Sequence, residues 1–119
     1  LLIYACPGQG SQSEGFLLPW IESYPALTNK LNELSEACGR DLVRLCTVAS
    51  EEEIKDTANA QRLIVAASIA IARVALAEKP PAGVVGHSVG EYAAAAIAGV
   101  LSDQEAMELV GVRADAMAR

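Results

Sequence analysis

The chain is poor in aromatic residues, in histidine and in positive charge. Its 119 residues include one Trp, three Tyr, one Phe and one His, and the formal net charge is −6. An acidic balance argues against a general nucleic-acid-binding protein, which normally carries a basic face. Only 4% of the residues are aromatic while 52% are hydrophobic. The core of one compact domain must therefore be built mainly from Ala, Leu, Ile and Val.

The sequence also lacks a disulfide pattern and a membrane-spanning run. Cys6, Cys38 and Cys46 form no C-x-x-C pair and are odd in number, which favours a reducing, cytoplasmic compartment. The longest apolar stretch, residues 63–77, contains Arg73 and is too short to span a bilayer. The apolar start of the chain has no basic segment and favours a strand over a signal peptide. We expect a soluble cytoplasmic protein that does not enter a membrane.

Two short apolar runs and several helical patterns predict a helix-rich α/β arrangement. Residues 1–6 and 83–87 are expected to be parallel strands, each buried on both faces of a sheet. Helices are predicted over 16–21, 23–39, 41–46, a short stretch starting at 50, 59–78, 89–98 and 102–118. The helix over 59–78 is apolar nearly all round and should be central. A sheet of only two strands suggests that the chain is part of a larger domain.

Several helix ends carry capping signals. Ser23 is expected to cap the helix that follows it, with Pro25 in the first turn, and Gly39 should end that helix. The patterns S-x-x-E at residues 50–53 and 102–105 are typical of capping boxes. These signals divide the helical part of the chain into separate helices joined by short loops.

The stretch "GVVGHSVGEY" places Ser88 between Gly86 and Gly90, after a predicted strand and before a predicted helix. In this G-x-S-x-G turn a serine sits at a sharp bend that lifts its hydroxyl out of the sheet, and the backbones approach too closely for side chains at the glycines. The N–H group of Val89 at the helix start would stabilise an oxyanion. Ser88 is thus a candidate nucleophile. A chance match is the alternative, which the strand-and-helix context disfavours.

A glycine-rich loop, "PGQGSQ", follows the first predicted strand. It is not a phosphate-binding P-loop, because G-K-[ST] is missing, and Ser13 breaks the dinucleotide pattern at its third glycine. The loop is either a simple turn or part of a site. Because parallel strands end at the same edge of a sheet, a backbone N–H of this loop could face Ser88 and complete an oxyanion hole.

Taken together, these motifs resemble the malonyl-CoA:acyl-carrier-protein transacylases. The similarity includes "PGQGSQ", "GHSVGE", "DTANAQ" and "VRADAM" and extends over the whole chain. Related acyltransferase domains of fatty-acid and polyketide synthases share the motifs. The resemblance implies a parallel-sheet, patatin-like acyltransferase core with a serine nucleophile elbow. Residues 1–119 would be the N-terminal portion of its large subdomain, without the small inserted subdomain and the C-terminal portion.

The resemblance also implies a reaction and its residues. Ser88 would attack the thioester of the substrate malonyl-CoA, and the phosphopantetheine thiol of the acyl carrier protein would then accept the malonyl group, in fatty-acid biosynthesis. The backbone N–H groups of Gln9 and Val89 would form the oxyanion hole, and Arg113 would bind the malonyl carboxylate. No cofactor and no metal are expected.

Two assignments stay open at this point. Arg113 could instead be an ordinary solvated arginine with an intrahelical partner among Glu105, Glu108 and Asp115. Glu91 belongs to the serine motif but is explained by its place in the first turn of a helix. Gln61, the last residue of "NAQ", is either a support for the site or a polar residue near a helix start.

The chain offers no evident general base for Ser88. His87 is the only histidine, and neighbouring side chains at a strand end point to opposite faces. In the family that the chain resembles, the catalytic histidine lies further downstream. We therefore expect the isolated chain to transfer malonyl groups poorly or not at all.

Two other functions use similar features. A serine esterase or patatin-like hydrolase would use the same elbow, although the lipase-type H-G-G-G motif is absent. A non-catalytic acyltransferase-like module would only contact a carrier protein. Acylation of Ser88 and the substrate preference set by Arg113 distinguish these functions from malonyl transfer.

Overall fold

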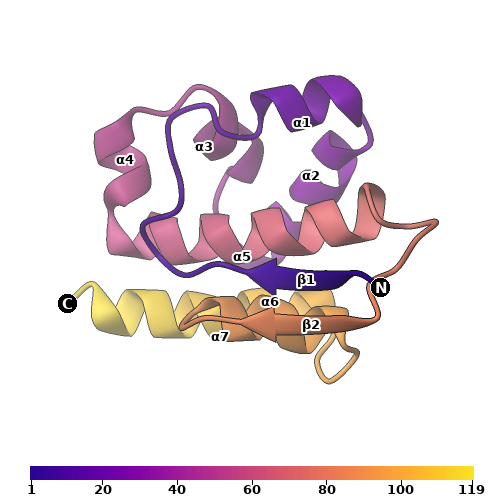
Figure 1. Ribbon diagram of the computed structural model, residues 1–119. Helices are drawn as coiled ribbons and strands as arrows, with labels where there is room; N and C mark the ends of the chain where they lie inside the picture. The colour runs from indigo at the N-terminus through magenta and orange to yellow at the C-terminus, as the bar shows by residue number, and fades with distance from the viewer.

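The computed structural model describes residues 1–119 and contains two strands and seven helices (Figure 1). The elements follow in the order β1 (Ile3–Cys6), α1 (Leu18–Ser23), α2 (Leu27–Cys38), α3 (Leu42–Thr47), α4 (Glu51–Lys55), α5 (Thr57–Val74), β2 (Gly83–Gly86), α6 (Gly90–Ile97) and α7 (Asp103–Met117). The predicted helix-rich α/β arrangement with a small parallel sheet is confirmed. No helix combines the length and the apolar character that crossing a membrane requires.

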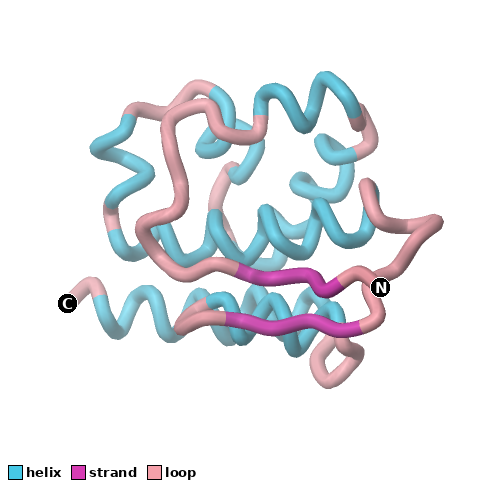
Figure 2. The backbone as a smooth tube through the Cα atoms, in the orientation of Figure 1, coloured by secondary structure: helices cyan, strands magenta, loops and turns pink.

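The two strands run side by side in parallel (Figure 2), with Ile3 opposite Gly83 and Cys6 opposite Gly86. In Figure 1, α1 to α4 lie on one side of α5 and β1, and α6, α7 and β2 lie on the other. The hydroxyl of Tyr4 donates a hydrogen bond of 2.8 Å to the carbonyl of Ser68. This contact fixes β1 against the middle of α5.

The strands are not buried on both faces, so that prediction was wrong. Along β1 the exposure alternates: Ile3 is 52% exposed, whereas Cys6 is 2% exposed. Ala5 and its register partner Val85 are both exposed. Side chains alternate between the faces of a strand, and the helices cover only one face of this sheet. The opposite face is open.

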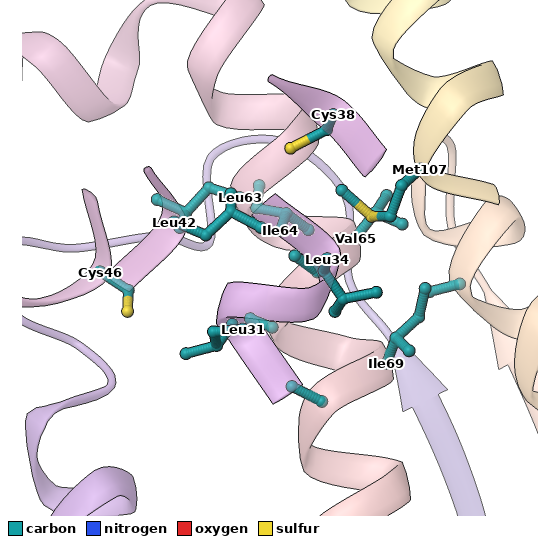
Figure 3. Close-up of a cluster of buried hydrophobic side chains, with 14 of the residues drawn as sticks. Leu31, Leu34, Cys38, Leu42, Cys46, Leu63, Ile64, Val65, Ile69 and Met107 are labelled. Carbon is teal, nitrogen blue, oxygen red and sulfur yellow. The ribbon is translucent and has the colours of Figure 1, made fainter. Parts of the chain in front are cut away.

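Most of the core lies between helices, and Cys6 of β1 is the only strand residue among its buried members. Leucines of α2 and α3 meet the apolar side of α5, and Met107 of α7 closes the cluster (Figure 3). Twelve of the 18 residues of α5 are buried, which confirms the prediction of a central buried helix. The leucines at 27, 31 and 34 that formed the predicted stripe of α2 are at most 1% exposed.

The capping signals were correct in most places. Ser102 and Glu105 form a complete capping box at the start of α7. Ser50 caps α4 by accepting from the Glu53 N–H at 3.2 Å, but the Glu53 carboxylate pairs with Arg44 instead of closing the box. Gly39 ends α2 with a left-handed φ of 70°, a conformation that glycine adopts without strain.

Two predicted helix boundaries were wrong. Ser23 does not cap the second helix but ends α1, and α2 begins at Leu27. Pro25 explains the break, because a residue before proline is pushed out of the helical region, and Tyr24 has φ −132° and ψ 80°. The long helix α5 ends at Val74 rather than at residue 78, because the following residues must carry the chain back to the start of β2.

Candidate active site

Four segments far apart in the sequence meet at one side of the molecule. The carboxyl ends of β1 and β2, the start of α5 and the end of α7 all lie on the left in Figure 1. The loop after β1 carries Gln9, and the loop after β2 carries Ser88. This is the edge at which open parallel sheets bind their ligands.

Ser88 lies in a strained turn between β2 and α6. Its φ is 55°, and it is the only non-glycine residue with a positive φ. A Cβ atom at Gly86 would lie 2.5 Å from the carbonyl oxygen of Gly90, and a Cβ at Gly90 would overlap the carbonyl oxygen of Cys6. Both positions therefore require glycine. The backbone has the form of a nucleophile elbow, and strain of this kind persists only where the surroundings impose it.

Two backbone N–H groups are available beside Ser88. The turn uses the N–H groups of Gly90, Glu91 and Tyr92, which donate to the carbonyls of residues 87, 88 and 89 at 3.0 to 3.1 Å. The N–H of Val89 takes no part in these bonds. The loop after β1 approaches the same point, because a Cβ built on Gly8 would lie 3.4 Å from the Cβ of Ser88. The N–H of Gln9 in that loop is likewise outside the backbone hydrogen bonds.

A pocket of about 350 Å³ joins the serine to the predicted carboxylate anchor. It is lined by Ser88, Glu91, Tyr92, Ala95, Leu101 and Arg113. A nucleophilic hydroxyl and a guanidinium thus line one cavity with an apolar wall. His87 does not belong to this lining, as the expected opposite direction of its side chain implies.

Arg113 has no carboxylate partner. Its Nη1 donates to Oε1 of Gln61 at 2.9 Å, and none of the ion pairs of the molecule includes it. The three acidic residues considered as intrahelical partners are used elsewhere: Glu105 accepts from the Ser102 N–H, Glu108 from Gln104, and Asp115 from Arg62. The interpretation of Arg113 as an intrahelical salt-bridge residue is therefore wrong.

Gln61 connects the two halves of the site. Its side chain is almost completely buried, with the residue 1% exposed. While its Oε1 accepts from Arg113, its Nε2 donates to Oε1 of Gln9 at 3.3 Å, and Nε2 of Gln9 donates to Thr57 at 3.3 Å. One amide thus ties the arginine to the glycine-rich loop. The sequence alone did not distinguish Gln61 from an ordinary polar residue near a helix start, because its burial depends on the packing of α5.

Other reactive groups do not compete with Ser88. The three cysteines are free and buried. Burial raises the pKa of the Cys46 thiol to about 11 and also raises the pKa of the thiols of Cys6 and Cys38. Thiols in this state are not thiolate nucleophiles at neutral pH. No group of three or more His, Cys, Asp or Glu side chains is placed to hold a metal ion.

The protein family that matches this chain, and the relatives described below, are acyl transferases. A model of the acyl transferase domain family matches residues 3–119. The malonyl CoA-acyl carrier protein transacylase of Mycobacterium bovis is 45% identical over 123 aligned positions, which cover 100% of this chain and 40% of that protein. The transacylase of Escherichia coli is 39% identical over 112 positions, covering 92% of this chain and 36% of that protein.

Solved structures that resemble this chain are also transacylases. A malonyl transacylase crystal structure from Mycobacterium tuberculosis superposes with a TM-score of 0.87 at 45% identity, covering 98% of this chain and 39% of that one. A malonyl-transacylase in complex with a type II polyketide synthase acyl-carrier protein superposes with a TM-score of 0.88 at 37% identity, covering 97% and 38%. The chain spans about two fifths of the length of the relatives that it matches.

Proposed function

The chain belongs to the acyl transferase domain family, and on that premise we propose that it carries the nucleophilic half of a malonyl-CoA:acyl-carrier-protein transacylase site. The reaction is malonyl transfer from malonyl-CoA to the phosphopantetheine thiol of an acyl carrier protein, in fatty-acid biosynthesis. Residues 1–119 form the N-terminal portion of the large subdomain of that enzyme in this proposal. A cytoplasmic location accords with the three free, buried thiols.

The first half-reaction forms an ester on Ser88. Its oxygen attacks the thioester carbonyl of malonyl-CoA, and the negative charge moves to the carbonyl oxygen, where the N–H groups of Gln9 and Val89 stabilise it. The carbon–sulfur bond then breaks, and the leaving thiolate of coenzyme A takes the proton that the serine lost. In the second half-reaction the carrier-protein thiol attacks the malonyl-serine ester and restores the hydroxyl.

The observation that carries this proposal is the pocket shared by Ser88 and Arg113. A guanidinium binds a carboxylate by two parallel hydrogen bonds, and Arg113 has no carboxylate of its own. A malonyl group would supply that carboxylate while its thioester carbonyl reaches Ser88. A substrate without a carboxylate would leave the arginine charge unpaired, so the site is suited to malonyl rather than acetyl groups.

The general base is proposed to come from outside these 119 residues. His87 is the only histidine of the chain, and it does not line the pocket of Ser88. A serine without a base is a weak nucleophile. The residues described here therefore supply the nucleophile, the oxyanion donors and the carboxylate anchor, and acylation should be slow without an added base.

Intact-mass spectrometry after mixing with malonyl-CoA tests the proposal, with imidazole added to replace the missing base. The expected result is one malonyl group on the unaltered protein and none on a Ser88→Ala variant. Equal labelling of both proteins, or no labelling of either with imidazole present, would contradict the proposal. Without imidazole, a His87→Ala variant should acylate as slowly as the unaltered protein, and a still slower rate would make His87 the base.

The pathway has a second candidate. The related transacylase in complex with a polyketide carrier protein supports a role in polyketide synthesis as the alternative to fatty-acid synthesis. Both carrier proteins present the same thiol, so the chemistry at Ser88 is the same. Transfer rates to purified carrier proteins of the two kinds distinguish the pathways.

A further inference from the structure

A second arginine lies next to Gln61 on α5 and is more deeply buried than Arg113. The side chain of Arg62 is 6% exposed. Its Nη1 and Nη2 donate to the two carboxylate oxygens of Asp115, each at 2.9 Å. The same nitrogens donate to the carbonyls of Ala58 at 2.7 Å and of Gly111 at 3.3 Å. Only its Nε has no partner.

Near the C-terminal end of α7, Arg62 and Gln61 of α5 hold this helix from different sides. Gly111 and Asp115 are one helical turn apart and share a face of α7, and both bond to Arg62. Arg113 lies between them in sequence, so it projects about 200° away from each, and it bonds to Gln61. Adjacent residues of α5 therefore hold two different sides of the end of α7.

Gly111 allows this close approach. A Cβ atom at Gly111 would lie 3.2 Å from Nη2 of Arg62, which is tighter than ordinary van der Waals contact. The guanidinium thus lies directly against the backbone of α7. A rigid, bidentate contact of this type fixes both the distance and the orientation of the groups it joins.

We propose that Arg62 and Asp115 are positioning residues that fix the rotation of α7 about its axis and thereby direct Arg113 into the pocket of Ser88. Neither residue lines that pocket, so they act through Arg113. The role in substrate preference rests on the proposed malonyl-transfer function. The ordering of Arg113 does not depend on that function.

Charge and position make opposite predictions for an Asp115→Asn variant. If Asp115 acts only through its charge, its removal takes a negative charge away from the neighbourhood of Arg113, and a malonyl carboxylate should bind more tightly. If Asp115 positions α7, the loss of the bidentate pair lets the helix end rotate. Arg113 then loses its fixed direction, and malonyl-CoA should bind more weakly.

The experiment measures Arg113 directly and the ligand separately. The ¹⁵N relaxation of the Arg113 Nε–H group reports its order in the absence of ligand, and calorimetry gives the Kd values of malonyl-CoA and acetyl-CoA. We expect Asp115→Asn to lower the order parameter of Arg113. We also expect it to raise the Kd of malonyl-CoA by roughly threefold to tenfold and to leave that of acetyl-CoA unchanged.

Two further variants serve as controls. Asp103→Asn removes an ion pair between the same two helices at their other end, and it should leave the order of Arg113 unchanged. Arg62→Met removes the contact without leaving a buried charge unpaired, so it keeps the test valid if Asp115→Asn does not fold. It too should lower the order of Arg113.

Two results would overturn the inference: an unchanged order parameter in both Asp115→Asn and Arg62→Met, or a tighter malonyl-CoA complex in Asp115→Asn. Failure of the proposed function gives a different result. If the unaltered protein does not prefer malonyl-CoA over acetyl-CoA, the proposed function fails, while the order parameter of Arg113 alone still decides the positioning role.

Discussion

The two ends of the contact between α5 and α7 use charge in opposite ways. The helices run antiparallel, so the start of α7 lies against the end of α5. There Asp103 pairs with Arg73 at 2.8 Å and with Lys30 of α2 at 2.9 Å. At the other end Arg62 pairs with Asp115, but Arg113 hydrogen-bonds only to a neutral amide. At the first end each of these cations is paired with a carboxylate, whereas the second end keeps one unpaired cation, Arg113, beside a pocket.

The difference separates stability from recognition. In a partly buried ion pair the two charges neutralise each other, so the pair holds helices together but offers little charge to a ligand. An arginine oriented by a neutral amide retains its full charge and its free donors for an incoming carboxylate. Two similar helix ends can therefore serve different purposes, and their variants should affect different measurements.

The largest effect on stability is expected in the apolar core between the two ends of the α5–α7 contact. Met107 is fully buried among side chains of α2 and α5 (Figure 3). Met107→Ala should lower the free energy of unfolding by about 2–5 kcal/mol, because it creates a cavity in a packed core. Urea denaturation followed by circular dichroism measures the loss.

Met107→Leu is the matched control, since a swap of similar volume should cost less than about 1.5 kcal/mol. Malonyl-CoA affinity per folded molecule should be preserved in both variants. An unchanged free energy of unfolding for Met107→Ala would contradict the prediction, and a large change in affinity would show that this core also positions the site.

The next largest effect is expected at the unpaired end. Arg113→Ala should reduce the preference for malonyl-CoA over acetyl-CoA by about 10–100-fold, the range expected when charge-assisted hydrogen bonds to a carboxylate are lost. The free energy of unfolding should fall by about 1 kcal/mol, because Oε1 of the buried Gln61 loses its donor. Competition binding with the two thioesters measures the preference. Equal loss for both would favour the hydrolase interpretation over malonyl transfer.

A variant at the Asp103 end should affect stability alone. Asp103→Asn removes a charge that two cations share, and it should lower the free energy of unfolding by about 1 kcal/mol, the upper part of the range for partly exposed pairs. Ligand preference should not change. If Asp103→Asn altered malonyl-CoA binding as strongly as Arg113→Ala, the division of roles between the ends would be wrong.

The smallest effect is a change in acid sensitivity. Burial opposes ionisation of Asp103, but hydrogen bonds from Arg73 and Lys30 outweigh it and lower the pKa of this carboxyl below its ordinary value. A lowered pKa contributes stability above the unfolded-state pKa, about 4, and this stability is lost as the pH falls through the folded-state pKa.

Denaturation between pH 6 and pH 3 should therefore show a shallower loss of stability for Asp103→Asn than for the unaltered protein. The pKa values of Glu53, Glu105 and Asp115 are also lowered. These groups are common to both proteins, so the difference between the two curves isolates Asp103. Parallel curves would contradict the prediction.

Local signals in the sequence were sufficient for most of the fold. The capping box at Ser102 and the glycine at residue 39 act within a few residues, and the structure places the helix ends there. The glycines of the serine turn were predicted from the same kind of short-range constraint. Where a local rule was overlooked, at Pro25, the predicted boundary was wrong.

Long-range contacts could not be predicted in this way. Arg113 and Gln61 are 52 residues apart in sequence, and Arg62 and Asp115 are 53 apart. From the sequence, partners for Arg113 could be proposed only within its own helix, because only distances along one helix are known before the fold is. The packing of α7 on α5 determines the actual contacts: Asp115 pairs with Arg62, and Arg113 lines the pocket of Ser88 without a carboxylate partner.

The left-handed backbone conformation of Ser88 lowers the stability of the fold at the residue that is the proposed nucleophile. A non-glycine residue at φ 55° costs on the order of 1–3 kcal/mol, and glycine would adopt the same turn without that cost. A Ser88→Gly protein would thus adopt the turn without this strain and would lack the proposed nucleophile. Selection for stability alone would favour glycine at this position, so a strained serine there accords with the proposed catalytic role.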